Sequence, residues 1–560
     1  MEQASYPWLK HYEEGVPHSI QYPPIPLHRT LEDAAARFPG RPALVFLGAS
    51  ISYRRLNALA DRFASVLQGL GVAKGDRVAL MLPNCPQLVI GFYGTLKAGA
   101  VAVLTNPLYV ERELEHQLRD SGARVMVTLT KFYSTVDKVR PRTSLEHVVA
   151  TNIKEYFPPL KRLLFTLLLE AKDGHRARVE TGPGTHWIAD LMRRATPTPR
   201  PVEISPDDIA IYQYTGGATG VPKGAILTHL NLLANTIQTR QWFVQLVEGQ
   251  EVMLGVIPFF HVYGLTVAMS MGLYSGATIV LLPRFETKEV LETIKKYRPT
   301  IFPGVPTMYV AINNHPEADK YDLRSIKACI SGAAPLPVEV QRRFEELTGG
   351  RLSEGYGLTE AAPVTHCNPI HGLRKEGSIG TPFPDVEARI MDIETGLKEL
   401  PVGEVGEMVI RAPQVMKGYR GCPEDTALAL RGGWLYTGDM ARMDEDGYFF
   451  IVDRKKDLIL AGGYNIYPRE IEEVLYQHPK VKEAVAVGLP DAYRGETPKV
   501  YVVLKDGETS TREEILDFCR QNLAKYKVPT AVEFRQDLPK TLVGKVLRRL
   551  LRDEEAAKAR

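Results

Sequence analysis

Residues 214–224 form a glycine-rich run, YTGGATGVPKG, that comes shortly after the apolar residues Ile209, Ala210 and Ile211. The run holds four glycines, two threonines and one lysine within eleven residues. Glycines let successive backbone N–H groups converge on an anion, while threonine hydroxyls and a lysine add further donors. The pattern therefore predicts a buried strand that leads into a phosphate-binding loop, with a flexible surface turn as the alternative. It differs from the common nucleotide-triphosphatase loop, because its lysine follows a proline and precedes a glycine.

Two stretches of the chain, residues 42–130 and 251–312, alternate between short apolar runs and helical patterns. Such alternation is typical of α/β units with largely parallel sheets. We therefore expect two α/β subdomains. The expected strands are 43–47, 78–82, 101–104, 252–257 and 278–282, and the expected helices in the first stretch include 53–70 and 86–98.

From about residue 376 to 453 the expected strands become short, and glycine and aspartate mark frequent turns. This texture favours a small antiparallel β unit. A charged run, DRKKD at residues 453–457, separates this unit from a last α+β unit. The elements expected in the last unit are helices 468–477 and 511–523 and strands 481–487 and 498–504.

The composition excludes several classes of protein. A net charge of +3 over 560 residues gives no indication of a nucleic-acid partner. The five cysteines lie far apart without a Cys-x-x-Cys pair, which argues against a disulfide framework or a zinc site and favours a reducing cytoplasm. The first residues, Met1 to Pro7, have neither a basic start nor an apolar core, so we expect no signal peptide.

Leucines are concentrated in residues 160–169, LKRLLFTLLL, which also contain Lys161 and Arg162. The run is too short to span a membrane, because a helical span needs ~20 apolar residues. Two interpretations remain open. The segment is either an amphipathic helix that rests on a membrane surface or an ordinary helix packed on the protein body. The sequence alone favours the packed helix.

The glycine-rich run resembles the phosphate loop of the adenylate-forming superfamily, which includes the acyl-CoA synthetases. The usual pattern of that loop is Thr/Ser-Ser/Gly-Gly-Thr/Ser-Thr-Gly-x-Pro-Lys-Gly, and this chain departs from it at Ala218, where a hydroxyl residue is usual. Further motifs arrive in the superfamily's order and span most of the chain. They are SGAAP at 331–335, EGYGLTE at 354–360, WLYTGD at 434–439, DRKKD at 453–457, GGYNIYP at 462–468 and PKTLVGK at 539–545.

This resemblance implies that the chain binds ATP and Mg²⁺. Tyr356 is expected to stack on adenine, and Asp439 and Arg454 are expected to bind the ribose. A carboxylate such as Glu360 suits Mg²⁺, which takes one or two carboxylates and keeps phosphate oxygens as other ligands. Thr215 is the second expected metal contact. The remaining expected nucleotide contacts are Gly216, Gly217, Thr219, Gly220, Lys223, Gly332, Ala333, Gly357 and Thr359.

The resemblance also assigns functions to the last unit. Lys545 corresponds to the catalytic lysine of the superfamily, and Gly462 and Gly463 correspond to the loop that enters the site when CoA is bound. The implied fold is α/β, with a large N-terminal domain of two α/β subdomains and a β-rich unit, followed by a small mobile α+β domain. The implied boundaries are 1–453 for the N-terminal domain, with its β-rich part at about 376–453, then 454–457 for a hinge and 458–560 for the C-terminal domain.

The segment PFFHVYG at 258–264 resembles the neighbourhood of the carboxylate substrate. Relatives that activate amino acids carry an aspartate near here, whereas this chain has His261, which disfavours an amino-acid substrate. We therefore expect His261 in the acid pocket, with a part in catalysis. PGVPT at 303–307 resembles a further pocket wall, in which Gly304 is expected to leave space for an acyl chain. Residues 433–460 look most like bacterial long-chain fatty acid–CoA ligases.

The expected reaction is ATP-dependent activation of a long-chain fatty acid to an acyl-adenylate with release of pyrophosphate, followed by thioester formation with CoA. Two alternatives stay open: a fatty acyl-AMP ligase that loads an acyl carrier protein, and a CoA ligase for a medium-chain or aryl acid. The expected location is the cytoplasm. Peripheral contact with the inner face of the cell membrane and a homodimer are further open alternatives.

Overall fold

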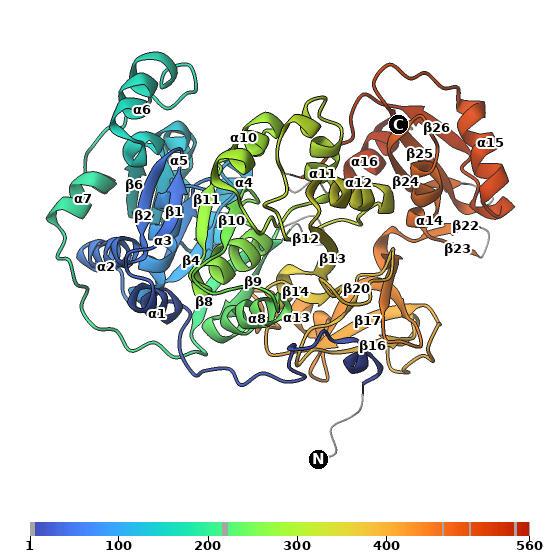
Figure 1. Ribbon diagram of the computed structural model, residues 1–560, viewed down its shortest axis with the longest axis horizontal. Helices are drawn as coiled ribbons and strands as arrows, with labels where there is room; N and C mark the ends of the chain where they lie inside the picture. The colour runs from blue at the N-terminus through green and yellow to red at the C-terminus, as the bar shows by residue number, and fades with distance from the viewer. Residues whose placement is uncertain (1–5, 216–221, 462–463, 492–493, 542–545, 559–560) are drawn as a thin grey trace.

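The first α/β unit is built on an eight-stranded sheet (Figure 1). The computed structural model describes residues 6–215, 222–461, 464–491, 494–541 and 546–558. In spatial order the strands are β18 (Gly418–Tyr419), β9 (Lys223–Thr228), β8 (Ile209–Thr215), β4 (Val101–Leu104), β3 (Arg77–Met81), β5 (Val125–Leu129), β6 (His147–Thr151) and β7 (Thr185–Trp187). From β8 to β7, each strand runs parallel to the next one in this order. Strand β9 runs antiparallel to both of its neighbours, β8 and β18.

Helix α2 (Tyr53–Gly69) leads into β3, and α3 (Pro86–Lys97), α4 (Glu111–Ser121) and α5 (Tyr133–Val139) connect strands of this sheet. Ser52 begins α2 as its N-cap, because its side chain accepts a hydrogen bond from the Arg55 backbone N–H. Helix α3 is buried on all sides, as its nearly continuous apolar sequence requires. The helices expected at 53–70 and 86–98 are therefore confirmed.

The second α/β unit has a sheet in the order β10 (Val252–Gly255), β11 (Thr278–Leu281), β1 (Pro42–Phe46) and β2 (Ala49–Ser52). Single bridges through Ile301 continue it to the sheet of β12 (Ala328–Ser331), β13 (Arg351–Gly357), β14 (Val364–Cys367) and β15 (Thr381–Pro382). Strand β1 pairs in parallel with β11, so the first strand of the chain completes the second unit. The helices of this unit are α8 (His229–Trp242), α9 (Met271–Tyr274), α10 (Thr287–Tyr297), α11 (Pro306–Asn313) and α12 (Val338–Thr348).

A five-stranded antiparallel sheet follows, as the turn-rich sequence predicts. Its strands are β16 (Glu387–Met391), β17 (Gly406–Arg411), β20 (Trp434–Met443), β19 (Leu430–Arg431) and β21 (Phe449–Arg454). Two strands within residues 376–453 lie elsewhere: β15 pairs with β14, and β18 pairs with β9 in the eight-stranded sheet. The β-rich stretch is therefore tied into both α/β units.

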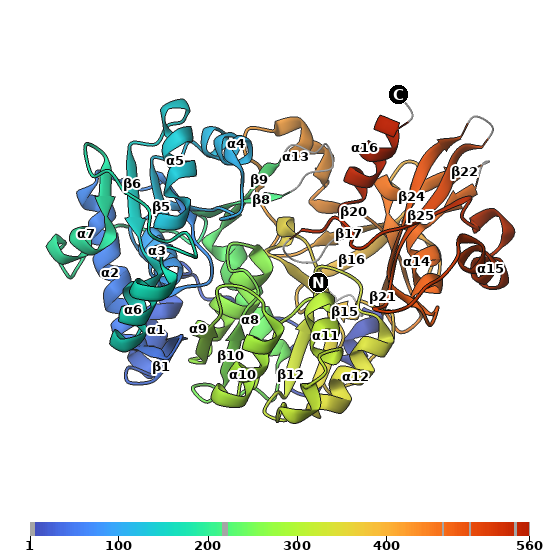
Figure 2. The ribbon, with the colours of Figure 1, turned by 90° about the horizontal axis from the view of Figure 1, so that it is seen from above.

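The last unit has its own apolar core, which includes Ile459, Ile471 and Val500. Figure 2 shows it beside the sheet of β16, β17 and β20. Its strands are β22 (Ile459–Ala461), β23 (Tyr464–Ile466), β24 (Val481–Asp491), β25 (Gly495–Leu504) and β26 (Ala531–Phe534), and its helices are α14 (Pro468–Tyr476), α15 (Arg512–Asn522) and α16 (Arg548–Lys558). The remaining helices of the chain include α1 (Arg29–Arg37), α6 (Pro159–Leu164), α7 (Ile188–Arg194) and α13 (Pro423–Ala429).

The leucine-rich segment is helical and packs on the body through Phe165, but its leucines are exposed. Helix α6 continues into a π-helical turn, η5 (Phe165–Leu169). The exposed fractions of its leucines range from 44% at Leu169 to 69% at Leu160. The leucines therefore do not form the buried stripe of an ordinary amphipathic helix, and contact of this segment with a membrane stays a prediction. In the described ranges, no helix combines the length and apolar character that crossing a membrane requires.

Candidate active site

The glycine-rich run joins two antiparallel strands, β8 and β9, and its end residues Thr215 and Lys223 are register partners. The expected contacts Gly216, Gly217, Thr219 and Gly220, together with Ala218, lie outside the described residues. The Lys223 Nζ atom lies 2.5 Å from Asp425 Oδ1 and 5.7 Å from the centre of the Tyr419 ring. A largely buried cation therefore stands at the base of the hairpin, next to a carboxylate that the sequence motifs do not include.

Glu360 faces the same hairpin. It lies in a short 3₁₀ turn, η8 (Thr359–Ala361), which packs against β8 and β9. Tyr419 of β18 donates a hydrogen bond of 2.7 Å from its hydroxyl to Glu360 Oε1. Burial, followed by the charge of Glu360, raises the pKa of Tyr419 well above its ordinary value, so its hydroxyl remains a donor.

The Glu360 carboxylate suits a metal ion that arrives with a phosphate ligand. One hydrogen bond from Tyr419 leaves further lone pairs on a carboxylate, which has about four acceptor positions. Within the described ranges no group of three His, Cys, Asp or Glu side chains is arranged to hold a metal ion. This donor set fits Mg²⁺ better than Zn²⁺, since Mg²⁺ takes few carboxylates and completes its shell with phosphate oxygens and water.

One hydrogen bond and one ion pair join Asp439 to Tyr356 and Arg454 in a single cluster. The Tyr356 hydroxyl donates to Asp439 Oδ2 at 2.5 Å, and Arg454 Nε lies 3.3 Å from Asp439 Oδ1. Asp439 and Arg454 are register partners of β20 and β21, while Tyr356 comes from the end of β13. Burial raises the pKa of Tyr356 well above its ordinary value, with the Asp439 charge as the second cause. The three residues that the sequence assigns to the nucleoside are thus in direct contact.

The turn that carries His261 lies between the two α/β units. Gln213 of β8 donates through Nε2 to the Phe260 carbonyl at 3.0 Å, and the Tyr263 hydroxyl donates to the Ile330 carbonyl of β12 at 2.6 Å. His261 is half-buried in this turn, and its Nδ1 accepts from the Tyr263 backbone N–H at 3.4 Å. A seven-residue π-helix, η6 (Gly264–Ser270), follows it, and such segments often occur at functional sites.

The adenine-motif residues come directly after β12. A Cβ atom on Gly332 would lie 3.3 Å from the Tyr263 ring, so the glycine permits this close packing. Ala333 is exposed and has a φ of 69°, a left-handed conformation that a residue with a Cβ adopts at a cost. Strained backbone of this kind clusters at ligand sites, which agrees with the expected role of Ala333.

The expectation that Gly304 leaves space for an acyl chain is wrong. A Cβ atom on Gly304 would lie only 2.5 Å from the ring and hydroxyl of Tyr309. Tyr309 is fully buried, and its hydroxyl donates to the Phe302 carbonyl at 3.0 Å. The side chain of Tyr309 therefore occupies the space above Gly304. Gly357 has a similar packing requirement, because its Cβ would lie 2.2 Å from the Pro363 carbonyl oxygen.

Charged side chains of the last unit hold the 454–457 segment. Arg548 of α16 donates to both carboxylate oxygens of Glu472, at 2.7 and 2.8 Å, and its Nη1 lies 3.4 Å from Asp457 Oδ2. Burial, followed by the nearby Arg454 charge, lowers the pKa of Lys456. Lys545, Gly462 and Gly463 lie outside the described residues, although Lys540 and Val546 on either side of the last motif form a bridge pair.

The charge of Arg469 in the last unit acts on Glu354, which precedes Tyr356 on β13. Glu354 is buried, and this burial raises its pKa to about 7, with the Arg469 charge of α14 acting in the opposite direction. Arg469 Nη1 also donates to the Ile451 carbonyl at 2.7 Å. No sequence motif pointed to Tyr419, Asp425, Arg469 or Arg548, because each acts through a contact between distant segments.

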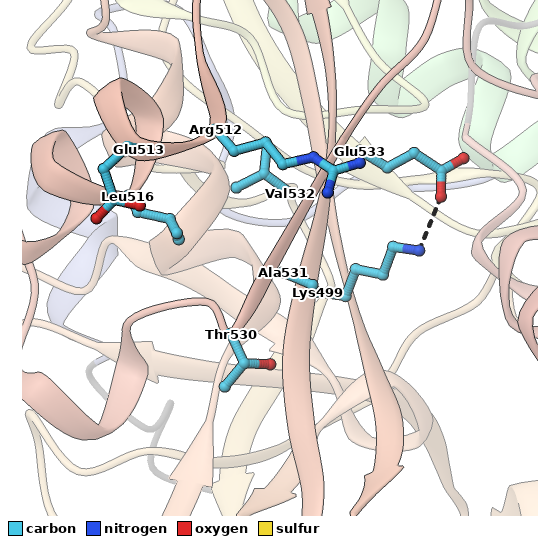
Figure 3. A pocket seen from close by; sticks show the side chains of 8 residues that line it. All are labelled: Lys499, Arg512, Glu513, Leu516, Thr530, Ala531, Val532 and Glu533. Atoms are coloured by element: carbon cyan, nitrogen blue, oxygen red, sulfur yellow. Dashed lines mark hydrogen bonds and ion pairs between the residues drawn. The ribbon is translucent and has the colours of Figure 1, made fainter.

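The last unit also has a cavity of about 300 Å³ on its surface (Figure 3). Its lining residues are Lys499, Arg512, Glu513, Leu516, Thr530, Ala531, Val532 and Glu533. Lys499 is already paired with Glu533 at 2.8 Å and with Glu555 at 2.9 Å. None of the described site residues lines this cavity, so it is separate from the candidate active site. The β8–β9 hairpin, Glu360 and the Tyr356–Asp439–Arg454 cluster form that site.

Comparison with known proteins supports the same assignment along the whole chain. Residues 31–420 match the family described as AMP-binding enzyme, and residues 470–545 match the AMP-binding enzyme C-terminal domain. The long-chain-fatty-acid–CoA ligase of Bacillus subtilis (strain 168) is 49% identical over 555 residues, which cover 99% of both chains. That of Escherichia coli O6:H1 is 40% identical over 568 residues, which cover 98% of both chains.

Solved structures match over nearly the full length as well. An anthranilate CoA ligase in complex with anthranoyl-AMP gives a TM-score of 0.85 at 28% identity, covering 96% of this chain and 98% of that chain. A fatty acyl CoA synthetase of Mycobacterium tuberculosis gives a TM-score of 0.72 at 30% identity, covering 95% and 99%.

Proposed function

The chain belongs to the family of AMP-binding enzymes, and we propose that it is an AMP-forming ligase that joins a long-chain fatty acid to CoA. The observation that carries the proposal is the meeting of the β8–β9 hairpin, Glu360 and the Tyr356–Asp439–Arg454 cluster around one segment, residues 354–361. They meet in a chain that is 49% identical over 555 residues to a long-chain-fatty-acid–CoA ligase.

The proposed reaction has two steps. A carboxylate oxygen of the fatty acid attacks the α-phosphorus of ATP, and the bond from that phosphorus to pyrophosphate breaks. The thiol sulfur of CoA then attacks the acyl carbonyl carbon, the bond to AMP breaks, and the thiol proton is released. The first step brings an anion against a polyanion, so fixed cations and donors must offset the repulsion.

The nucleoside is held by the cluster around Asp439. Asp439 accepts hydrogen bonds from the ribose hydroxyls, since a carboxylate has acceptor capacity beyond its contacts with Tyr356 and Arg454. The Tyr356 ring lies against adenine, and its hydroxyl bond to Asp439 fixes the ring relative to the ribose. Gly332 and Ala333 let the backbone come close to the flat base.

The phosphates are held between the hairpin and Glu360. Lys223 exchanges its contact with Asp425 for a phosphate oxygen, and the loop supplies backbone N–H groups and the hydroxyls of Thr215 and Thr219. Glu360 and Thr215 would hold Mg²⁺. Bound there with ATP, the ion would neutralise phosphate charge and act as a Lewis acid. His261, in the turn beside β8, contacts the carboxylate of the acid.

The C-terminal domain serves the two steps in turn. Lys545 stabilises charge near the α-phosphate during the first step, and Gly462 and Gly463 line the entry of the CoA thiol during the second. The domain rotates about residues 454–457 between the steps, which is ordinary hinge behaviour. In support of this hinge, Arg454 ends the last strand of one sheet and Ile459 begins the first strand of the next.

Pyrophosphate release from a series of carboxylic acids of increasing length, with and without CoA, tests the proposal. We expect the highest rates on long-chain acids and an acyl-CoA product that mass spectrometry identifies. An acyl-adenylate that accumulates with free CoA present would instead indicate an acyl-AMP ligase for a carrier protein. Highest activity on aromatic acids would favour the aryl alternative, which the likeness to an anthranilate CoA ligase makes worth including.

The proposed location is the cytoplasm, with peripheral contact to the cell membrane. The exposed leucines of residues 160–169 are the candidate contact. Pairing of two copies through the same leucines is the alternative use of this surface.

A further inference from the structure

The exposed leucines of α6 and η5 form a helical stripe on the outside of the protein. Five of them follow the spacing i, i+3, i+4, i+7, i+8, which normally marks the buried face of a helix. Their exposed fractions are 69% for Leu160, 56% for Leu163, 46% for Leu164, 67% for Leu167 and 68% for Leu168. In both ribbon views α6 lies at the end of the molecule opposite the C-terminal unit (Figures 1 and 2).

The side of this segment that faces the protein is well packed. The Phe165 ring contacts the rings of Phe157 and His175, with centroid distances of 5.3 and 5.7 Å. Buried Glu170 accepts from Lys154 Nζ at 2.7 Å and from Asn152 Nδ2 at 3.0 Å. The inner side of the segment is therefore fixed to the first α/β unit, and the leucines face outward as a consequence of that packing.

The charges around the stripe are mainly positive. Between residues 159 and 178 the basic residues are Lys161, Arg162, Lys172, Arg176 and Arg178, and all are exposed. The acidic residues in this range are Glu170, which is buried and paired with Lys154, and the exposed Asp173. Just beyond this range, the exposed Glu180 lies 3.6 Å from Arg178, so the basic residues still outnumber the exposed acidic ones. An apolar stripe with a basic surround is complementary to an anionic lipid surface, where apolar burial and attraction to headgroups add.

We propose that residues 159–178 dock the protein on anionic lipid bilayers, with the leucines at the boundary of headgroups and acyl chains and the basic residues against phosphate headgroups. The proposed function supplies the reason why docking is useful, but the docking itself does not depend on it. A long-chain fatty acid partitions into bilayers, so an enzyme held at the surface meets its substrate there.

Co-sedimentation with vesicles of phosphatidylcholine alone, or mixed with phosphatidylglycerol, tests the docking. We expect binding to the anionic vesicles that weakens as salt is raised, because headgroup attraction is screened. The pair Leu167→Glu and Leu168→Glu should lower the partition coefficient by roughly tenfold or more, since two inserting side chains become charged. Lys172→Ala with Arg178→Ala should lower binding to anionic vesicles selectively.

A matched control uses exposed leucines elsewhere, Leu373→Glu with Leu397→Glu, at positions with exposed fractions of 52% and 81%. This pair should bind vesicles as the unmodified protein does. A tryptophan introduced as Leu168→Trp should be quenched by brominated acyl chains. Unchanged vesicle binding in the Leu167–Leu168 pair, or no added quenching, would overturn the proposal.

One further outcome would identify the stripe as an interface between two copies, and the conditions of the assay keep docking separate from ligase activity. If light scattering finds a dimer that the Leu167–Leu168 pair converts to a monomer while vesicle binding stays intact, the stripe is an interface between copies and the proposal fails. Vesicle binding is measured without ATP, acid or CoA. Loss of docking therefore leaves the proposed ligase activity standing, and pyrophosphate release from a water-soluble medium-chain acid should be unchanged in every docking variant.

Discussion

The Tyr356 hydroxyl donates a 2.5 Å hydrogen bond to Asp439 Oδ2 across 83 residues of sequence. The bond joins the end of β13, in the second α/β unit, to β20, in the antiparallel sheet. Because Arg454 lies against the other oxygen, the carboxylate is oriented from both sides. A ribose that binds Asp439 and a base that lies on Tyr356 would thus share one rigid support.

The first prediction separates Asp439 from Glu360. Asp439→Asn should weaken ATP binding by roughly 10- to 100-fold at every Mg²⁺ concentration, because hydrogen bonds to a charged group contribute about 1.5–3 kcal/mol each. Glu360→Gln should weaken MgATP binding mainly at low Mg²⁺ and recover when Mg²⁺ is in excess. Calorimetric titration with ATP over a series of Mg²⁺ concentrations measures both effects.

The exposed Glu339 provides a control for these two variants, since its side chain is 86% exposed and outside the site. Glu339→Gln should bind MgATP as the unmodified protein does. If Asp439→Asn and Glu360→Gln respond identically to Mg²⁺, the separate assignment to ribose and metal is incorrect.

Much of the fold followed from local patterns. Strands near 43–47, 78–82 and 101–104 are present because runs of apolar residues bounded by turns have few other ways to become buried. Their partners did not follow from the sequence. Strand β1 pairs with its chain neighbour β2 and also with the distant β11, and the two-residue strand β18 joins β9 from within the β-rich stretch. Long-range pairing depends on which surfaces fit, and a periodicity cannot express that.

The second prediction concerns Gly304. Gly304→Ala should lower the free energy of unfolding by about 1–3 kcal/mol, because the new methyl group meets the buried Tyr309 ring and overpacked cores lose stability on this scale. Urea denaturation measures the loss. The pattern of activity across acid chain lengths should remain that of the unmodified enzyme. A stable Gly304→Ala variant with a shortened acid preference would restore the pocket-wall interpretation.

The third prediction uses the buried Glu354, whose pKa burial raises to about 7 from its usual 4.5. The folded state holds this proton more tightly than the unfolded chain, so Glu354 destabilises the folded state increasingly as the pH rises from 4.5 through 7. Glu354→Gln cannot ionise and should flatten this part of the stability profile. At pH 8 the variant should be more stable by up to about 3 kcal/mol, at ~1.4 kcal/mol per pKa unit.

Denaturation at several pH values from 4.5 to 8 measures this difference. Some decline should remain in the variant, because burial also raises the pKa of Asp453, to about 6. Parallel profiles for Glu354→Gln and the unmodified protein would show that Glu354 ionises without cost.

The candidate site was predictable where chemistry resides in a short motif, and not where it depends on contact. Asp439, Arg454 and Tyr356 lie in three separate motifs and meet in one cluster. Asp425 and Tyr419 belong to none of the motifs, yet they contact Lys223 and Glu360. The prediction that Gly304 leaves space for an acyl chain failed for the same reason, because a glycine in a motif does not reveal which neighbouring side chain fills the space beside it.

The last prediction divides the two half-reactions between Lys545 and Gly463. A cation near the α-phosphate stabilises the charge that develops in the first step, and losing one such contact typically costs ~10²–10³ in rate. If the C-terminal domain then rotates about residues 454–457, Lys545 is remote when CoA attacks. Lys545→Ala should therefore lose pyrophosphate release by that factor and still convert supplied acyl-adenylate and CoA to the thioester.

Gly463→Leu should show the reverse pattern, because a side chain there would obstruct the thiol. Rapid-quench measurement of each half-reaction separates the two variants, and Lys540→Ala, five residues before Lys545, serves as a control for removing a lysine from the same segment. Rotation also requires the contacts of Arg548 with Glu472 and Asp457 to keep α16 attached to its own unit while the hinge moves. Equal damage to both half-reactions in both variants would mean that one fixed arrangement performs both steps, and the hinge at 454–457 would then have no catalytic role.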